Sequence, residues 1–432
     1  MAELSREQMV AQHVEKNFRW NFSVNLIDVA FIMFGLNLIS RETVIPLLIS
    51  QLTDSKIAIG ALPAIFSLGI YLPQLIGANI AETMPYKKPF VAIVGGIGER
   101  LPYLMAGILV FLFAETAPNL ALPALMICFG IAGASAGLGT PAWFDLISKV
   151  IPVQRRGLFT GLSFGIGALM GLAGSAVIAL VLDRWLFPAN FAILFGLASI
   201  ALLISWVGLL LNREPESLNL HAPMRLNAYL QRLPIILREN RNFSRYIGTM
   251  AIARAATMAS GFFLVYGDER FQLSATDVGI LTGILVGGQA ILNPIWGMLG
   301  DRYGHKVVLA CGAFALSLAA LLAAFALNLI WLYAAFVLLS AFIAADTASF
   351  LTIIPEFCGE ADRPTYIGLS NTLLAPVTAL APLFGGWLAT VADFPPMFML
   401  AGVLAAAGAA LLFIWVREPR HTPEAAPEPA HG

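Results

Sequence analysis

Residues 297–306 read Gly-Met-Leu-Gly-Asp-Arg-Tyr-Gly-His-Lys, a short charged loop between two long apolar runs. The runs on its two sides, 277–299 and 306–326, each have the roughly 20 mainly apolar residues that a membrane-crossing helix needs. The loop therefore marks a point where the chain turns at a membrane surface. This stretch predicts a helical membrane protein, and the segments on either side of it support the same fold class.

The composition agrees with that prediction. Of the 432 residues, 59% are hydrophobic and only 12% are charged, whereas a soluble domain carries about 25% charged residues. The net charge of −1 gives no basic surface for a nucleic acid. The cysteines Cys128, Cys311 and Cys358 have no spacing that suggests disulfides or a metal site. Because no nucleophile–base pattern is present either, the sequence predicts neither an enzyme nor a cofactor.

Twelve segments are apolar enough and long enough to cross a membrane. The predicted spans are 20–50, 57–80, 89–114, 119–148, 157–182, 187–211, 246–267, 277–299, 306–326, 329–353, 365–391 and 395–416. We therefore expect an all-α membrane protein of twelve transmembrane helices, arranged as two pseudo-symmetric six-helix bundles. The predicted divisions are an N-terminal segment 1–19, a first bundle 20–211, a linker 212–245, a second bundle 246–416 and a disordered tail 417–432.

The placement of lysine and arginine predicts the orientation. With the N-terminus inside, nineteen of the 25 basic residues lie in inner segments and three in outer loops. Inner loops of membrane proteins carry the excess of positive charge, so we expect a multi-pass protein of the cell membrane with both termini in the cytoplasm. The first twenty residues are polar and amphipathic, unlike a cleavable signal. In the linker, leucines at 226, 230, 233 and 237 predict an amphipathic helix on the inner membrane surface.

The two halves repeat one another. Arg213-Glu-Pro215 ends the sixth span and Arg417-Glu-Pro419 ends the twelfth. Likewise, Gly161-Leu-Ser163 opens the fifth span and Gly368-Leu-Ser370 the eleventh, and an Asn-Phe pair precedes both the first span, at Asn17, and the seventh, at Asn242. Such matches indicate two parallel repeats of six helices.

The loop at 297–306 has the pattern G-x-L-x-D-R-x-G-x-K, which resembles the signature loop of the major facilitator superfamily of transporters. The resemblance extends over residues 20 to about 417 and implies a carrier that works by alternating access. By this resemblance the loop latches the cytoplasmic helix ends together. Gly297 would allow close helix approach, Asp301 would face a neighbouring helix N-terminus, and Arg302 and Lys306 would anchor to the cytoplasmic side.

The equivalent loop of the first half, residues 77–88, keeps less of the pattern. Glu82 can stand for the aspartate, but the arginine and the loop glycine are missing. The two signature loops are therefore predicted to differ, with the latch pattern kept better in the second half than in the first. Arg155 and Arg156 could pair with Glu82, or could simply be solvated at the surface.

Charges inside the predicted spans are the main functional candidates. A charge at the bilayer centre costs roughly 2.5–3.5 kcal/mol on insertion scales. The charged residues within spans are Asp28, Arg41, Glu42, Glu99, Arg100, Asp145, Arg254 and Asp346. At the helical rise, Asp28, Arg254 and Asp346 lie about 12 Å below the inner surface. Because the repeat places Asp28 opposite Arg254, these two charges could form a gate.

The other charges suggest further roles. Adjacent residues on a helix point in different directions, so Glu99 and Arg100 need not pair with each other. We expect one of them to meet a charge on the first span, with a proton relay as the alternative. Arg41 and Glu42 form an outer gate or a snorkelling pair. The resemblance places the first and fourth helices of each half around a central cavity, which brings Trp143 towards the pathway. The uncharged candidates for a substrate or coupling site are Asn25, Trp143, Gln289 and Asn293.

The sequence thus predicts a secondary active transporter of a small organic solute. Proton coupling would use Asp28, Asp346 or Glu99, because a substrate that displaces a neighbouring arginine would favour proton uptake by the carboxylate. With 29 phenylalanines in the chain, we expect an amphipathic solute that is exported. A nutrient-uptake symporter or uniporter is the alternative, and a non-transporting membrane receptor is the alternative from another class. Beyond the solute, a proton and lipid, no partner is predicted, and we expect a monomer.

Overall fold

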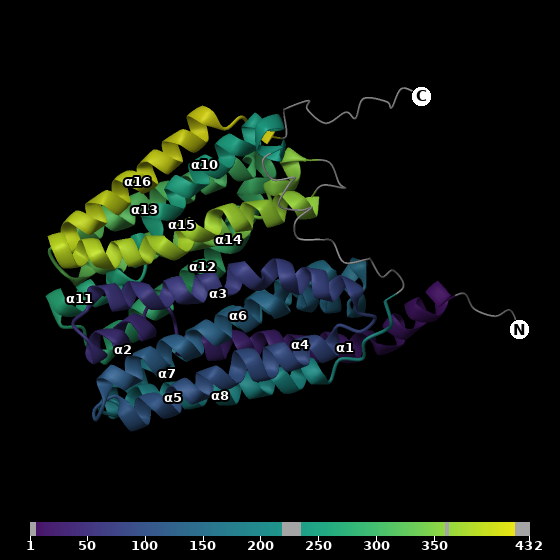
Figure 1. Ribbon diagram of the computed structural model, residues 1–432, viewed down its shortest axis with the longest axis horizontal. Helices are drawn as coiled ribbons and strands as arrows, with labels where there is room; N and C mark the ends of the chain where they lie inside the picture. Colours follow the sequence, from purple (N-terminus) through teal and green to yellow (C-terminus); the bar gives the residue numbers. More distant parts are fainter. Residues whose placement is uncertain (1–5, 218–234, 359–362, 420–432) are drawn as a thin grey trace, which may run out of the picture. The chain divides into compact units, whose positions relative to one another are not determined.

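The computed structural model describes residues 6–217, 235–358 and 363–419. Within these ranges the chain is helical and has no strand. Twelve of the described helices are long and apolar enough to cross a membrane, and each overlaps one predicted span. The prediction of an all-α, multi-pass membrane protein is therefore confirmed (Figure 1). Of the predicted linker helix, the leucines at 226, 230 and 233 lie outside the described residues, whereas residues 235–239 are helical.

The helices of the first half are α1 (Arg6–Leu38), α2 (Val44–Leu52), α3 (Lys56–Thr83), α4 (Lys88–Ile93), the π-helix η1 (Val94–Arg100), α5 (Leu101–Phe113), α6 (Pro118–Val150), α7 (Val153–Arg184) and α8 (Ala189–Leu210). Those of the second half are α10 (Arg241–Ala255), the 3₁₀ helix η2 (Ala256–Ala259), α11 (Phe262–Phe271), α12 (Ala275–Tyr303), α13 (His305–Ala324), α14 (Leu329–Ser349), the 3₁₀ helix η3 (Ile354–Phe357), α15 (Arg363–Ala392) and α16 (Phe394–Trp415). Helices α4, η1 and α5 together make one span, as do α10, η2 and α11.

The chain groups into two compact units. Unit 1 comprises Met1–Met224 and Gly261–Gly287, and unit 2 comprises Arg225–Ser260 and Gly288–Gly432. Helix α11 and the first part of α12 therefore belong to unit 1, together with the helices of the first half. The remainder of α12 belongs to unit 2, with α10 and α13–α16.

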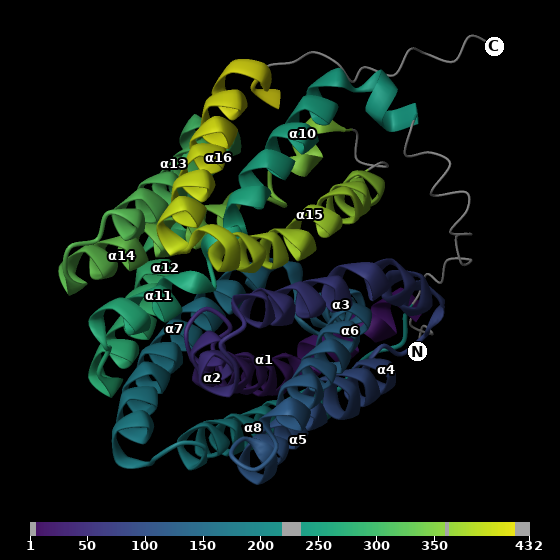
Figure 2. The same ribbon diagram turned by 60° about the vertical axis from the view of Figure 1, so that its left-hand side comes forward.

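In unit 1, glycines let α3 and α6 approach until their backbones are in contact. A Cβ added to Gly137 would lie 2.3 Å from the carbonyl oxygen of Ile70, and one added to Gly77 would lie 2.2 Å from that of Leu138. Figure 2 shows the two helices side by side. The glycine-rich stretch 130–139 thus forms the close-packing surface that its small-residue spacing predicts.

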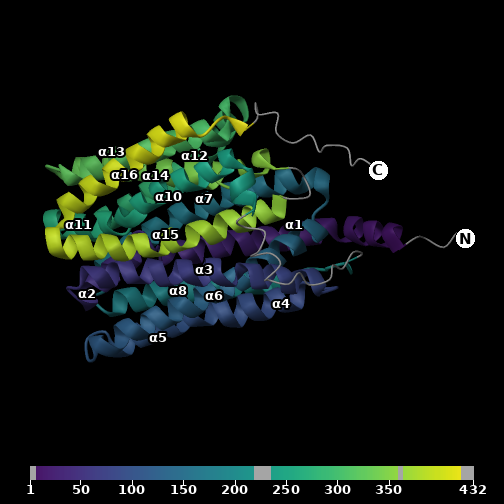
Figure 3. The ribbon, with the colours of Figure 1, turned by 45° about the horizontal axis from the view of Figure 1, so that its top comes forward.

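In unit 2, α13 is the most enclosed helix and packs against α14 and α16, which lie beside it in Figure 3. A Cβ on Gly312 would lie 2.5 Å from the Ala345 Cβ on α14. On α15, a Cβ on Gly385 would lie 2.4 Å from the carbonyl oxygen of Met258 in η2. The Pro-x-x-Gly-Gly element at 382–386 therefore packs against the non-α-helical turn of the neighbouring span.

Two local breaks interrupt the helices of unit 1. The first predicted span divides at residues 39–43, between α1 and α2. The break comes before Pro46, which lies in the first turn of α2. The second break is η1, seven residues of π-helix that begin with the glycine-rich sequence Val94-Gly-Gly-Ile-Gly98. Glycine is a weak helix former, and π-turns occur frequently at functional sites.

Candidate functional site

The first cluster of buried charge lies in unit 1 around Asp28 of α1. Its carboxylate accepts a hydrogen bond from the Ser205 hydroxyl of α8 at 2.5 Å and one from the Trp143 indole of α6 at 3.3 Å. Nη2 of Arg100 lies 3.5 Å from the same carboxylate. Asp28 is 2% exposed. Three other helices therefore each supply a donor to one carboxylate inside the bundle, and the prediction that Glu99 or Arg100 meets a charge on the first span is confirmed.

Arg100 is held mainly by neutral acceptors. Its Nη1 donates to the carbonyl oxygen of Gly95 at 2.6 Å, its Nε to that of Leu202 at 3.1 Å and its Nη2 to the Ser205 hydroxyl at 2.9 Å. A π-helix has i to i−5 bonds, so its carbonyls depart from the α-helical ladder, and Arg100 supplies an extra donor to one of them. Glu99 lies 3.6 Å from Arg100 Nη1. The guanidinium thus sits between two carboxylates and is closer to neutral oxygens than to either.

The second cluster lies in unit 2 and is a tight pair. Nη2 of Arg254 on α10 donates to both oxygens of Asp346 on α14, at 2.9 and 2.8 Å. The Arg254 guanidinium also lies over the ring of Phe350, 4.6 Å from its centroid. Phe350 is the C-cap of α14, four residues beyond Asp346, so the end of one helix supplies both contacts. Asp28 and Arg254, predicted as opposing gate charges, therefore each pair with another residue within their own unit.

Asn25 makes its hydrogen bonds outside the Asp28 cluster. Its amide exchanges hydrogen bonds with the Asn212 amide at 2.6 and 3.1 Å. Nearby, Asn21 bonds the backbone of Arg213 in both directions, and Asn242 does the same to the backbone of Arg417. By these contacts the counterpart of Asn242 is Asn21, four residues after the Asn17 that the sequence repeat had suggested. The offset that placed Asp28 opposite Arg254 does not hold at this end of the helices.

The remaining uncharged candidates lie on one face of α12. Gln289 and Asn293 are four residues apart and both are half-buried. The Oδ1 atom of Asn293 is buried and accepts no hydrogen bond from the described residues.

Arg41 and Glu42 lie in the break between α1 and α2. The Arg41 guanidinium lies over the Phe66 ring, 4.4 Å from its centroid, and is exposed. Glu42 accepts a 3.4 Å hydrogen bond from the Ser40 hydroxyl. Nearby, the hydroxyl of Thr282 donates to that of Thr43 at 3.0 Å, within unit 1. The two charges therefore contact other groups at the helix break.

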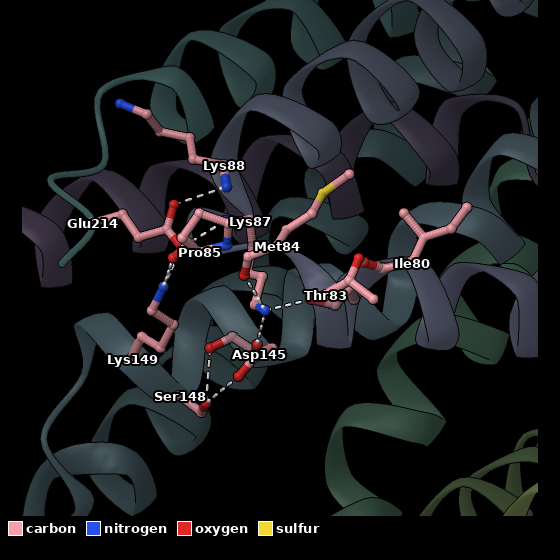
Figure 4. Close-up of polar contacts among 11 residues, drawn as sticks. Ile80, Thr83, Met84, Pro85, Lys87, Lys88, Asp145, Ser148, Lys149 and Glu214 are labelled. Carbon is pink, nitrogen blue, oxygen red and sulfur yellow. Dashed lines mark hydrogen bonds and ion pairs between the residues drawn. The ribbon is translucent and has the colours of Figure 1, made fainter. Parts of the chain in front are cut away.

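The loop between α3 and α4 is held by two charged side chains that replace the missing motif (Figure 4). Nζ of Lys87 is buried, donates to the carbonyl oxygens of Ala81 and Met84, and lies 3.3 Å from the Asp145 carboxylate on α6. It thereby satisfies carbonyls at the C-terminus of α3, where a cation is favoured. The side chain of Glu82 lies outside the described residues.

Glu214 closes the same loop from the other side. Its two carboxylate oxygens accept the backbone N–H groups of Lys87 at 2.7 Å and Lys88 at 2.8 Å, at the start of α4. The Lys149 ammonium of α6 lies 2.6 Å from the same carboxylate, as Figure 4 shows. The Glu214 side chain is 2% exposed. An anion at a helix N-terminus and a cation beside it are both electrostatically favourable.

The signature loop of the second half shows a related arrangement. Gly304 has φ +97°, and a Cβ there would lie 2.6 Å from the carboxylate of Glu418. Glu418 is the repeat counterpart of Glu214, so both Arg-Glu-Pro sequences place a glutamate at the start of the third helix of a half. Nζ of Lys306 donates to the carbonyl oxygen of Val416 at 3.1 Å, as Lys88 does to that of Asn212.

The other motif residues lie at the surface of this loop. Asp301 is largely exposed and lies 3.8 Å from the buried His305 at the start of α13. The Arg302 guanidinium lies over the Tyr303 ring. No heavy atom lies within 4 Å of a Cβ added to Gly297, so the expectation of close helix approach there is wrong. Close approach occurs at Gly300, where a Cβ would lie 2.5 Å from the His305 ring.

Reasoning from the sequence missed the roles of Lys87, Ser205 and Glu214. For Glu214 a signal was available, because Arg-Glu-Pro occurs at the end of both halves. Lys87 and Ser205 carry no such pattern, since their partners come from distant helices. Among the described residues, no group of three or more His, Cys, Asp or Glu side chains is placed to hold a metal ion.

Comparisons with known proteins agree with the fold and the motif. Residues 245–431 match the model of the Major Facilitator Superfamily. Multidrug resistance protein 1 of Bacillus subtilis is 28% identical over 159 residues, which are 36% of this chain and 40% of that protein. An uncharacterized MFS-type transporter of Mycobacterium tuberculosis is 27% identical over 323 residues, 62% of this chain and 55% of that protein. The matched stretch thus spans about half the length of these curated relatives or less.

Solved structures extend the similarity over the chain. A D-xylose-proton symporter superposes with a TM-score of 0.70 at 15% identity and covers 93% of this chain and 99% of its own. At that identity the likeness concerns the fold alone. The fold, the signature loop at 297–306 and the matching sequences lead to one assignment. Together these similarities support a transporter of the MFS type, without assignment to a subfamily.

Proposed function

We propose that the chain is a secondary active transporter that moves a small organic solute across the cell membrane by alternating access, coupled to protons. The observation that carries this proposal is the pair of charge clusters within membrane-spanning helices, Asp28 with Arg100 in unit 1 and Arg254 with Asp346 in unit 2. Ionisable residues inside a membrane are expensive and mark substrate or proton pathways. A protein whose only role was structural would be more stable with apolar residues at these positions.

The chemistry of both clusters suits coupling. Each holds a carboxylate beside an arginine, and an arginine favours the charged form of its neighbour. A solute that competes for the guanidinium would leave the carboxylate ready to take a proton. Binding of solute and proton would thereby be linked within one site.

We further propose that the solute is amphipathic and exported. The similarity to a protein named for multidrug resistance supports this direction. The aromatic side chains beside the clusters, Trp143 and Phe350, give the charged groups apolar neighbours that suit such a solute. Uptake of a nutrient is the other direction that the test below would detect.

The loop contacts have a place in this mechanism. We place both termini and the loops at 84–88 and 297–306 on the cytoplasmic side, in accord with the excess of lysine and arginine there. Contacts such as Glu214 with Lys149 would then hold the cytoplasmic helix ends together in one state of the cycle. Arg41 and Glu42, at the opposite end of α1, would act near the outer gate.

Transport into proteoliposomes tests the proposal. Purified protein is reconstituted, a pH gradient is imposed, and the movement of ethidium and of a library of small organic solutes is followed. We expect flux that depends on the gradient, that falls at least tenfold in Arg254→Ala and that persists in Glu115→Gln, a matched change at an exposed residue. Solute binding without flux in any orientation would refute transport and favour a receptor.

A further inference from the structure

We infer that Glu99 is the residue that takes up the coupling proton, and that Asp28 remains an anion. The inference rests on the proposed proton-coupled transport and assigns the proton to one carboxyl group. It is specific to this chain, because it depends on the π-helix η1, which ends at Arg100 with Glu99 just before it.

The cluster of unit 1 has more carboxylates than arginines. Two carboxylates, Asp28 and Glu99, lie 3.5 and 3.6 Å from a single arginine, Arg100. Among the described residues, the titratable and charged groups that face Glu99 are these two and Tyr103, one turn further along the same span. Arg41, beyond Tyr103, lies over the Phe66 ring at the helix break. With both carboxylates ionised, the cluster carries a net charge of −1 among membrane-spanning helices, where an uncompensated charge is strongly unfavourable. One proton makes it neutral.

Of the two carboxylates, Asp28 has the surroundings that favour its ionised form. Asp28 accepts hydrogen bonds from Ser205 and Trp143 and lies beside Arg100. Its side chain is 3% exposed. Hydrogen bonds donated to a carboxylate stabilise its ionised form, and three donors from three helices meet this one. These donors thus stabilise Asp28 as an anion.

Glu99 has the opposite surroundings. No described residue donates a hydrogen bond to its carboxylate within hydrogen-bond distance, and its ion pair with Arg100 is long, at 3.6 Å. Meanwhile Nη1 of Arg100, the nitrogen nearest Glu99, makes its short bond to the Gly95 carbonyl oxygen instead. The Glu99 side chain is 17% exposed, against 3% for that of Asp28. A neutral carboxylic acid suits this position.

The step itself is a simple exchange. A carboxylate oxygen of Glu99 takes a proton from hydronium, which leaves water and a neutral carboxyl group, and Arg100 then balances Asp28 alone. Release reverses the exchange. In the cluster of unit 2, Asp346 has an arginine of its own, Arg254, at 2.8 Å.

Infrared spectroscopy of the purified protein tests the assignment without measuring transport. Surface carboxylates are ionised at neutral pH, so a C=O stretching band of a protonated carboxyl group there reports a buried acid. We expect one such band in the wild type, its loss in Glu99→Gln, and its persistence in Asp346→Asn and in the exposed control Glu115→Gln. Glu99→Asp keeps a carboxyl group at this position and should show a band at a shifted frequency. That band would show that the loss in Glu99→Gln comes from the missing carboxyl group and not from a folding defect.

The opposite pattern would overturn the inference. Because loss of either carboxyl group leaves one carboxylate to balance Arg100, the conservative exchanges decide between the two residues. A band that shifts in Asp28→Glu and is unchanged in Glu99→Asp would place the proton on Asp28. If the wild type shows no band at neutral pH, the cluster holds its negative charge and the charge-balance argument fails. Because the spectra do not depend on flux, a protein that shows the Glu99 band but moves no solute would retain the proton assignment and lose the proposed function.

Discussion

Replacing Glu214 with alanine should loosen the end of unit 1 where α3, α4 and α6 meet. The carboxylate accepts two backbone N–H groups at the start of α4 and pairs with Lys149 at 2.6 Å. Alanine removes all three contacts and leaves the two N–H groups at a site that is 2% exposed for the glutamate side chain. Lys149 keeps its 3.1 Å bond to the carbonyl oxygen of Pro85, so only part of its stabilisation is lost.

The expected size follows from these contacts. A hydrogen bond to a charged group contributes about 1.5–3 kcal/mol, and loss of a helix N-cap costs about 0.5–2 kcal/mol. Allowing for water that enters the vacated site and for the remaining bond of Lys149, we expect Glu214→Ala to lower the free energy of unfolding by about 3 kcal/mol. Glu214→Gln keeps one acceptor oxygen but loses the charge, so its effect should be about half as large.

Unfolding in mixed detergent and SDS micelles, followed by circular dichroism, measures these differences. The order of stability should be wild type, then Glu214→Gln, then Glu214→Ala, with the exposed control Glu115→Ala near the wild type. A double-mutant cycle with Lys149→Met should give a coupling energy of about 1 kcal/mol. Equal stability of Glu214→Ala and Glu115→Ala would refute the argument that this carboxylate holds the loop.

Three further changes test other contacts, each by the same unfolding measurement. Arg254→Ala removes the partner of Asp346 and should destabilise the protein by about 3 kcal/mol, whereas the double change with Asp346→Ala should recover part of that loss; no recovery would show that the two charges are not coupled. Gly304→Ala should lower stability by about 1–3 kcal/mol, because φ is +97° and a Cβ would meet a carboxylate; a neutral effect would contradict that geometry. Gly137→Ala should destabilise by more than 2 kcal/mol through its clash with the α3 backbone, while Gly161→Ala, which has open space, should be neutral or stabilising; equal effects would sink the close-packing account.

The membrane helices could be predicted from the sequence because length and hydropathy are enough to recognise each of them. The sequence also predicted that a charge of the third span would reach the first, since a charge in a membrane requires a partner. It could not predict that the partner would be Arg100 rather than Glu99. That choice depends on η1, and the glycines of 94–98 are the only trace of the π-helix in the sequence.

The errors have physical causes. Gly297 was assigned a packing role from a motif, but whether a glycine is crowded depends on the facing helix, which a local pattern does not contain. Asn17 was aligned with Asn242 by the identity of a following phenylalanine, whereas the hydrogen bonds of Asn21 to Arg213 define the true counterpart. The burial of Lys87 carries no local signal in the sequence, because it arises from helix ends that are far apart along the chain.

The contacts of Glu214 also determine where the protein can be modified. The backbone N–H of Ser217 still donates to the carbonyl oxygen of Pro85 at 3.0 Å, so the ordered contacts of unit 1 extend seven residues beyond the end of α8 at Leu210. A reporter domain or protease site inserted between Leu211 and Glu214 would separate this anchor from its helix, even though hydropathy marks the membrane span as already complete. An insertion after Ser217 would leave every contact described here intact.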